Sequence, residues 1–335
     1  MGLKQPTIWL ITLIITAVVT YAAYSPGFGA GWTYDDTSYL KHLANVRDFD
    51  TAMVYLVRDK SISITDRPIS MASFLLNIRD WPDNPSGFRQ INVLLHILNG
   101  LLVAAVVRLI ARRIPKLSSS YNGFAVAVAA IWMLHPFLAS TSFHVIQRMV
   151  LLAATFSLIG VIMYLHGRGQ LAKSNRDGYA WMTAGMLVSG GLGTLAKENA
   201  ALVPLLIAVL EYTVLCRYTP ISDRFLRLWK IIFFVFPAFL LLAYGIHYIT
   251  SSAPNLYLIR SFTLSDRIFS ESIILFEYVR QILLPDVTQM GPFQDDMWRI
   301  RSAGVITWLA VAIWVVLIGL AIFWRRKFPA LSFSI

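Results

Sequence analysis

The sequence predicts an all-α protein that crosses a membrane several times. Of its 335 residues, 57% are apolar and 14% are charged, whereas soluble domains carry about 25% charged residues. The mean hydropathy of +0.61 points the same way. The single cysteine, Cys216, excludes a disulfide-linked extracellular scaffold. An aromatic content of 13% excludes a disordered chain.

Apolar segments long enough to cross a bilayer occur about eight times, since a spanning helix needs roughly 20 residues. We expect spans at 7–24, 91–111, 123–140, 149–166, 179–196, 199–216, 230–249 and 303–324. The first span follows Lys4 and could be mistaken for a secretory signal. Its apolar run of about 18 residues is longer than a usual signal core, so we expect it to remain as a span.

Basic residues predict the orientation, because cytoplasmic segments carry an excess of Lys and Arg. With the N-terminus inside, the inner segments hold these basic residues: Lys4, Arg108, Arg112, Arg113, Lys116, Arg168, Lys173, Arg176, Arg217, Arg224, Arg227, Lys230, Arg325, Arg326 and Lys327. Their acidic residues are only Asp177 and Asp223. The pI of about 9.8 therefore indicates topology and not nucleic-acid binding. Both termini are expected in the cytoplasm.

The connections between spans are unequal in length. Residues 25–90 and 250–302 form two long outer loops, and tight outer turns are expected near 141–148 and 197–198. The first loop has helical patterns at 39–46, 51–57 and 69–78. In the second, apolar residues repeat at helical spacing over 266–284 with charges on the other face, which predicts an interfacial helix. We expect one membrane-embedded domain over 1–335.

The adjacent carboxylates Asp35 and Asp36 lie about ten residues after the first span. Carboxylates at the outer membrane edge can deprotonate an acceptor hydroxyl or bind a divalent cation. The alternative is a helix N-terminus, where Asp is favoured by capping and by the helix dipole.

Basic residues at the outer ends of spans are the second candidate feature. Gln147 and Arg148 open the fourth span, and Lys197 and Glu198 lie in the turn between the fifth and sixth. An arginine and a lysine that converge there would suit a phosphate, and ionisable groups at such depth are often functional. The alternatives are side chains that extend to the interface, or a Lys197–Glu198 surface pair of little energetic value.

Polar and small residues inside the spans predict helix packing. Asn92, His96 and Asn99 share one face of the second span, so hydrogen bonds to neighbouring helices account for them. Close packing is expected at the glycines of the fifth span, Gly190, Gly191 and Gly193. His135 and His144 do not have the spacing of zinc ligands.

Outer carboxylates, basic groups at headgroup depth and an amphipathic helix together fit an enzyme that takes a lipid-phosphate substrate from the outer leaflet. A transporter would show broken helices and charges at the membrane midplane. The centres of the predicted spans are almost free of charge.

Several stretches resemble known families. Residues 32–36, Trp-Thr-Tyr-Asp-Asp, resemble the acidic motif of GT-C-fold glycosyltransferases. Residues 92–99, 134–137 with 146–148, and 195–199 resemble the membrane part of the transmembrane-and-tetratricopeptide O-mannosyltransferases and their bacterial relatives. Residues 260–267, followed by 283–285, are similar to bacterial members. The matches run in order over nearly the whole chain.

The resemblance implies an inverting transfer of a sugar from a polyprenyl-phosphate carrier to an extracytoplasmic acceptor, such as a pilin or another protein or glycan. It makes Asp35 or Asp36 the general base, with Asp36 as an alternative ligand of a divalent cation, Mg²⁺ or Mn²⁺; no other cofactor is implied. It assigns the carrier phosphate to Arg148, Lys197, Arg260 and Arg267. Supporting roles fall to Gln147, Glu198, His144 and Arg67.

The resemblance also implies a bacterial inner-membrane protein with its site facing the periplasm, and no nucleic-acid partner. Some bacterial relatives are pilin arabinosyltransferases. Family members usually have more spans, and residues 328–335 look like the opening of a ninth, so we expect the natural chain to continue. A second class of function stays open: a non-catalytic lipid-handling or flippase-associated membrane protein, which would not need the carboxylates.

Overall fold

The computed structural model describes residues 5–57, 67–252, 263–288, 290 and 304–335. Every regular element in these ranges is a helix, and they contain no strand. The all-α prediction is therefore confirmed. Where one domain was expected, the chain divides into two compact units, Met1–Pro204 and Leu205–Ile335, and each is described by itself.

Long apolar helices identify the protein as an integral membrane protein. Among the described residues, six helices have the length and composition of membrane spans: Thr7–Gly27, Pro85–Ala111, Val145–Leu171, Glu198–Tyr218, Arg224–Thr250 and Val305–Trp324. Many of their apolar side chains are exposed; Ile306, for example, is 73% exposed. Such surface would be costly in water and is suited to lipid. About eight spans were expected, and a bent helix pair could add a seventh to these six.

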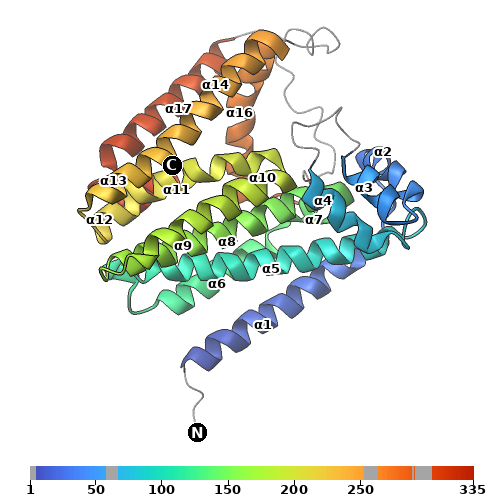
Figure 1. Ribbon diagram of the computed structural model, residues 1–335, viewed down its shortest axis with the longest axis horizontal. Coiled ribbons are helices and arrows are strands. Elements are labelled where there is room, and N and C mark those ends of the chain that lie inside the picture. Colours follow the sequence, from blue (N-terminus) through green and yellow to red (C-terminus); the bar gives the residue numbers. More distant parts are fainter. Residues whose placement is uncertain (1–4, 58–66, 253–262, 289, 291–303) are drawn as a thin grey trace. The chain divides into compact units, whose positions relative to one another are not determined.

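Unit 1 is a bundle of long helices with short helices gathered at one end (Figure 1). Its long elements are α1 (Gln5–Tyr24), α5 (Pro85–Ala111), α6 (Tyr121–Leu134), α8 (Arg148–Leu171) and α9 (Asp177–Met186). Helix α8 packs against α5 and α9, and α6 packs against α5 and α1. The short turn η4 (Pro115–Leu117) connects α5 to α6.

The predicted span at 123–140 is not one straight helix. Helix α6 ends at Leu134, and η5 (Pro136–Leu138) and α7 (Ala139–Phe143) continue at an angle of 52°. The residue before a proline avoids helical backbone angles, and His135 has φ −70° and ψ 122°. The His135-Pro136 sequence therefore breaks the span. The turn η6 (Val145–Gln147) then leads into α8.

The predicted span at 179–196 is helical, but it is not among the long apolar helices. It consists of α9, the π-helical turn η7 (Leu187–Leu192) and α10 (Gly193–Ala196). Lys197 is extended, with φ −158° and ψ 140°, and η8 (Glu198–Leu202) and α11 (Val203–Leu210) follow. A Cβ placed on Gly193 would lie 2.8 Å from the Cβ of Ala200. The chain therefore reverses tightly, as expected near 197–198.

A close backbone contact lies between α8 and α9, away from most of the glycines expected to pack closely. Gly193 is tightly packed, but nothing lies within 4 Å of a Cβ placed on Gly191. A Cβ on Gly185 would lie 2.6 Å from the carbonyl oxygen of Gly160, and one on Gly178 would lie 2.5 Å from that of Gly167. These two glycine pairs bring the backbones of α8 and α9 together.

A helical cap, which we define as residues 25–57 and 67–84, covers the N-terminal ends of α5 and α8. Its elements are η1 (Ser25–Gly27), α2 (Tyr34–Leu40), η2 (Lys41–Asn45), α3 (Phe49–Val57), α4 (Pro68–Phe74) and η3 (Leu75–Asn77). Leu40, Leu43 and Phe74 of the cap form one buried cluster with Phe88 of α5 and Met149 of α8. The helices expected at 51–57 and 69–78 are confirmed, and the one expected at 39–46 begins earlier, at Tyr34.

Unit 2 contains the remaining helices. In order they are η9 (Glu211–Leu215), α12 (Cys216–Tyr218), α13 (Arg224–Lys230), η10 (Ile231–Val235), α14 (Phe236–His247), η11 (Tyr248–Ser252), α16 (Leu264–Leu283), α17 (Val305–Trp324) and α18 (Pro329–Ser334). A short ion pair of 2.7 Å joins the Lys230 ammonium to the fully buried Glu211 carboxylate. It connects the two helical segments on either side of the turn at 219–223.

The amphipathic helix expected at 266–284 is α16. It starts at a capping box of Thr263 and Asp266 and packs along α17. The Phe269 ring lies 5.2 Å from that of Trp308, and the Trp314 indole N–H donates to the Ser272 carbonyl at 2.9 Å. One face of α16 is therefore covered by a candidate span. Its placement at the membrane interface stays a prediction.

Glycine-to-alanine substitutions test the α8–α9 contact. Gly185→Ala should lower the free energy of unfolding by about 1–3 kcal/mol, because the added methyl group meets backbone atoms that cannot rotate away. The measurement is the thermal unfolding midpoint in detergent. Gly191→Ala is the matched control, since its methyl group would meet open space. Equal midpoints for the two variants would contradict the packing.

Candidate functional site

Residues from four separate segments meet where the helical cap joins the bundle of unit 1. The backbone N–H of Ile146 donates to Asp36 at 2.9 Å. The neighbouring Gln147 accepts a hydrogen bond from the Lys197 ammonium at 3.4 Å. Arg67, just before α4, pairs with Glu198 at 3.1 Å. We call Arg67, Gln147, Lys197 and Glu198 the Lys197 cluster.

The adjacent carboxylates Asp35 and Asp36 have different environments. Asp36 is fully buried. It accepts from the Thr33 N–H at 3.0 Å and the Thr33 hydroxyl at 2.6 Å, besides the N–H of Ile146. The capping interpretation therefore applies to Asp36, which also ties α2 to η6. Asp35 is exposed and has no partner among the described residues.

The surroundings of Asp36 do not supply a set of ligands for a divalent cation. The described residues contain no group of three or more His, Cys, Asp and Glu side chains placed to hold a metal ion. Both oxygens of Asp36 already accept hydrogen bonds from protein donors. The residues around Asp36 therefore do not fit a metal ion, and no step is assigned to one.

Arg148 is fully buried, and its guanidinium is surrounded by protein acceptors. It donates to the side-chain oxygens of Asn92 at 2.9 Å and Asn77 at 2.8 Å. It also donates to the backbone carbonyls of Ser73 at 2.9 Å and Phe88 at 3.0 Å. A phosphate could reach Arg148 only if some of these bonds broke. In this conformation Arg148 joins the cap to α5 and α8.

Lys197 is half-buried at the break between α10 and η8. Burial lowers the pKa of its ammonium, the nearby Arg67 lowers it further, and Glu198 raises it. The charges of Arg67, Lys197 and Glu198 add to one positive charge. An anion that bound here would favour the protonated amine.

Arg67 holds the cap against this break. It adopts a left-handed conformation, with φ 49° and ψ 50°, which costs a non-glycine residue about 1–3 kcal/mol. Its Nε donates to both carboxylate oxygens of Glu198, at 3.1 and 3.2 Å. Ser70 of α4 donates to the carbonyl of Ala196 at 2.8 Å. The cap is therefore attached on both sides of Lys197.

His144 lies in the bend before η6. Its carbonyl accepts a hydrogen bond from the Asn92 amide at 3.1 Å, so its backbone belongs to the same junction. Arg260 lies outside the described residues.

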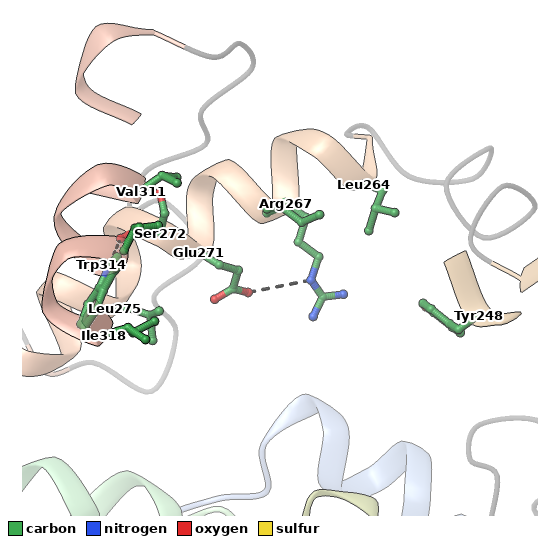
Figure 2. A pocket seen from close by; sticks show the side chains of 11 residues that line it. Tyr248, Leu264, Arg267, Glu271, Ser272, Leu275, Val311, Trp314 and Ile318 are labelled. Atoms are coloured by element: carbon green, nitrogen blue, oxygen red, sulfur yellow. Dashed lines mark hydrogen bonds and ion pairs between the residues drawn. The ribbon is translucent and has the colours of Figure 1, made fainter. Parts of the chain in front are cut away.

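Arg267 belongs to unit 2, where it lines an open, mostly apolar groove of about 610 Å³ between α16 and α17 (Figure 2). Its Nε lies 3.8 Å from Glu271, and both side chains are 49% exposed. Ion pairs this open to solvent contribute little stability. Arg267 is therefore a charged group at the side of a groove otherwise lined by residues such as Leu275, Val311 and Ile318.

Arg89 is a structural residue that sequence reasoning missed. It is 1% exposed, and it donates to the carbonyls of Phe28, Ala30 and Gly31 after α1. A bond of 3.0 Å to the Phe143 carbonyl adds α7. Its signal in the sequence was a charged residue in the second turn of a long apolar helix, where burial needs several acceptors.

The polar face predicted on the second span is confirmed. The Asn92 amide donates to the carbonyl of His144, and the Asn99 amide donates to that of Leu151 at 2.9 Å. The His96 ring lies 2.9 Å from the Met133 carbonyl. These three side chains join α5 to α6 and α8 and to the bend between them.

Comparison with known proteins adds no relative. No protein-family model, no curated protein and no solved structure matches this chain. The function is therefore argued from the chemistry of the site.

Asp36→Asn should lower the free energy of unfolding by about 1–3 kcal/mol, because an amide cannot accept all the hydrogen bonds that the buried carboxylate accepts. Thermal unfolding of the purified protein measures the change. Asp35→Asn is the matched control one residue away, and its midpoint should equal that of the wild type. A destabilised Asp35 variant with an unchanged Asp36 variant would reverse the two assignments.

Arg148→Lys should also destabilise the fold, by about 1–3 kcal/mol, because an ammonium cannot reach all the acceptors that the guanidinium fork serves. Denaturant unfolding measures this cost. If Arg148 is structural, the activity of each folded molecule should change little. Unchanged stability with lost activity would instead return Arg148 to the phosphate site.

Proposed function

We propose that the protein is a GT-C-like glycosyltransferase that moves a sugar from a polyprenyl-phosphate carrier to an acceptor hydroxyl outside the cytoplasm. The single observation that carries the proposal is the meeting of an accessible carboxylate region and a half-buried basic cluster at one end of unit 1. Asp36 binds Ile146, and the next residue, Gln147, binds Lys197. Asp35, the proposed general base, is therefore next to a carboxylate that one turn connects to the proposed phosphate site.

Asp35 is the general base in this proposal. It is exposed, whereas the carboxylate of Asp36 is occupied by capping and by Ile146. Asp35 takes the proton from the acceptor hydroxyl, and that oxygen forms a bond to the anomeric carbon of the sugar. The bond from this carbon to the phosphate oxygen breaks, with its electron pair remaining on the phosphate. Attack from the opposite face inverts the configuration.

Lys197 and Arg67 bind the carrier phosphate. The carrier phosphodiester has one negative charge and gains a second as the phosphate leaves. Two neighbouring cations therefore stabilise the transition state more than the ground state. Glu198 holds Arg67 in place through both carboxylate oxygens.

Unit 2 contains a separate feature suited to a lipid, the groove between α16 and α17. Its open, apolar walls suit a hydrocarbon, and Arg267 provides a cation at its side. The resemblance implies a bacterial inner membrane, and in this proposal the positive-inside bias puts the Lys197 cluster on the periplasmic side. The acceptor is a protein or glycan on that side.

The test is transfer from a polyprenyl-phosphate sugar by purified protein, measured as released polyprenyl phosphate. Asp35→Asn should abolish release while the unfolding midpoint stays unchanged. Lys197→Gln should lower kcat by about one to three orders of magnitude, at about 1.4 kcal/mol for each.

The alternative is a lipid-handling protein without catalysis. It predicts that the protein binds the carrier but releases no polyprenyl phosphate. It also predicts that Asp35→Asn leaves carrier binding unchanged. Gly191→Ala, whose methyl group would meet open space, serves as the control variant. Release that survives both Asp35→Asn and Lys197→Gln would overturn the assignment.

A further inference from the structure

Unit 1 has a groove of its own, which lies between α1, α5 and α6 near the C-terminal end of α5. Its volume is about 390 Å³. Apolar side chains such as Trp9, Leu13, Leu101 and Ala105 line most of it, and Arg108 and Asn122 lie among them. Helix α5 has 27 residues, so at about 1.5 Å per residue this end is roughly 30 Å or more from the Lys197 cluster.

Two guanidinium groups lie near this groove. Arg108 Nε donates to the Asn122 side-chain oxygen at 2.9 Å. The guanidinium carbons of Arg108 and Arg112 lie 5.7 and 5.6 Å from the centre of the Tyr121 ring. Both arginines are exposed, and neither forms an ion pair with an acidic side chain of the described residues. Their terminal N–H groups remain available to an anion.

The surrounding sequence supplies no counter-charge. Between Asp83 and Asp177 the chain contains no acidic residue, although it contains Arg113 and Lys116 close to the groove's arginines. A basic group without protein carboxylates, next to an apolar groove on candidate spans, has the chemistry of an anionic-lipid site.

We propose that this groove binds one anionic glycerophospholipid, with an acyl chain against Trp9, Leu13 and Ala105 and its phosphate between Arg108 and Arg112. The exposed leucines beside the groove, such as Leu10 at 59% exposure, place it on a lipid-facing surface. The phosphate accepts hydrogen bonds from the two guanidinium groups, and the Asn122 side chain fixes one of them. This site is separate from the proposed transfer site and does not depend on it.

Native mass spectrometry of the detergent-purified chain with added phosphatidylglycerol tests the site. One molecule of phosphatidylglycerol should bind in preference to phosphatidylcholine. Arg108→Gln with Arg112→Gln should weaken that binding roughly tenfold or more. Arg325→Gln with Arg326→Gln, which removes the same charge from unit 2, is the matched control and should change nothing.

Two further experiments distinguish a lipid site from a nonspecific attraction between opposite charges. Ala105→Trp fills the groove without changing charge and should also abolish the preference. Glycerol 1-phosphate, which has the phosphate but no chain, should not compete. If the double arginine variant does not fold, Arg112→Gln alone replaces it, because no protein acceptor bonds to that guanidinium in the described structure. Equal binding of both phospholipids, an unaffected Ala105→Trp variant, or an equal loss in the control would overturn the proposal.

Discussion

The burial of Arg148, with no carboxylate partner among the described residues, is the constraint on which unit 1 depends. A guanidinium removed from water is costly unless its N–H groups find acceptors. Here the acceptors are amide and carbonyl oxygens of Asn92, Asn77, Ser73 and Phe88. Because these oxygens belong to the cap and to α5, the position of the cap on the bundle follows from satisfying one buried cation.

The same need for hydrogen-bond partners applies to the other buried ionisable groups at this junction. Asp36 and Arg89 lie at the junction of cap and bundle, where Asp36 accepts from Thr33 and Ile146 and Arg89 donates to backbone carbonyls. Two groups of the proposed site are less enclosed. Asp35 is exposed, and Lys197, which follows a helix that ends at Ala196, is half-buried and donates to Gln147. In the proposed function, the surrounding hydrogen-bond network positions these two groups.

Charge also distinguishes the two ends of unit 1. At the cap end, Glu198 partly balances Arg67 and Lys197. At the other end, Arg108 and Arg112 lie near the Tyr121 ring, Arg108 bonds to Asn122, and neither forms an ion pair with an acidic side chain of the described residues. A phosphate-bearing lipid would suit both ends, as a substrate at the first and as a bound structural lipid at the second.

The sequence by itself determined the helical class, the long apolar helices, the polar face of α5 and the tight turn at Lys197. Each follows from a local property: hydropathy, helical spacing or a break in the pattern. The tertiary structure decided which of two adjacent aspartates is accessible, that Arg148 is enclosed, and that Gly160 and Gly185 make the close contact. The sequence also did not predict the burial of Arg89 or the pairing of Arg67 with Glu198. These depend on which acceptors and backbones lie opposite, across segments far apart in the chain, and local patterns contain no information about those partners.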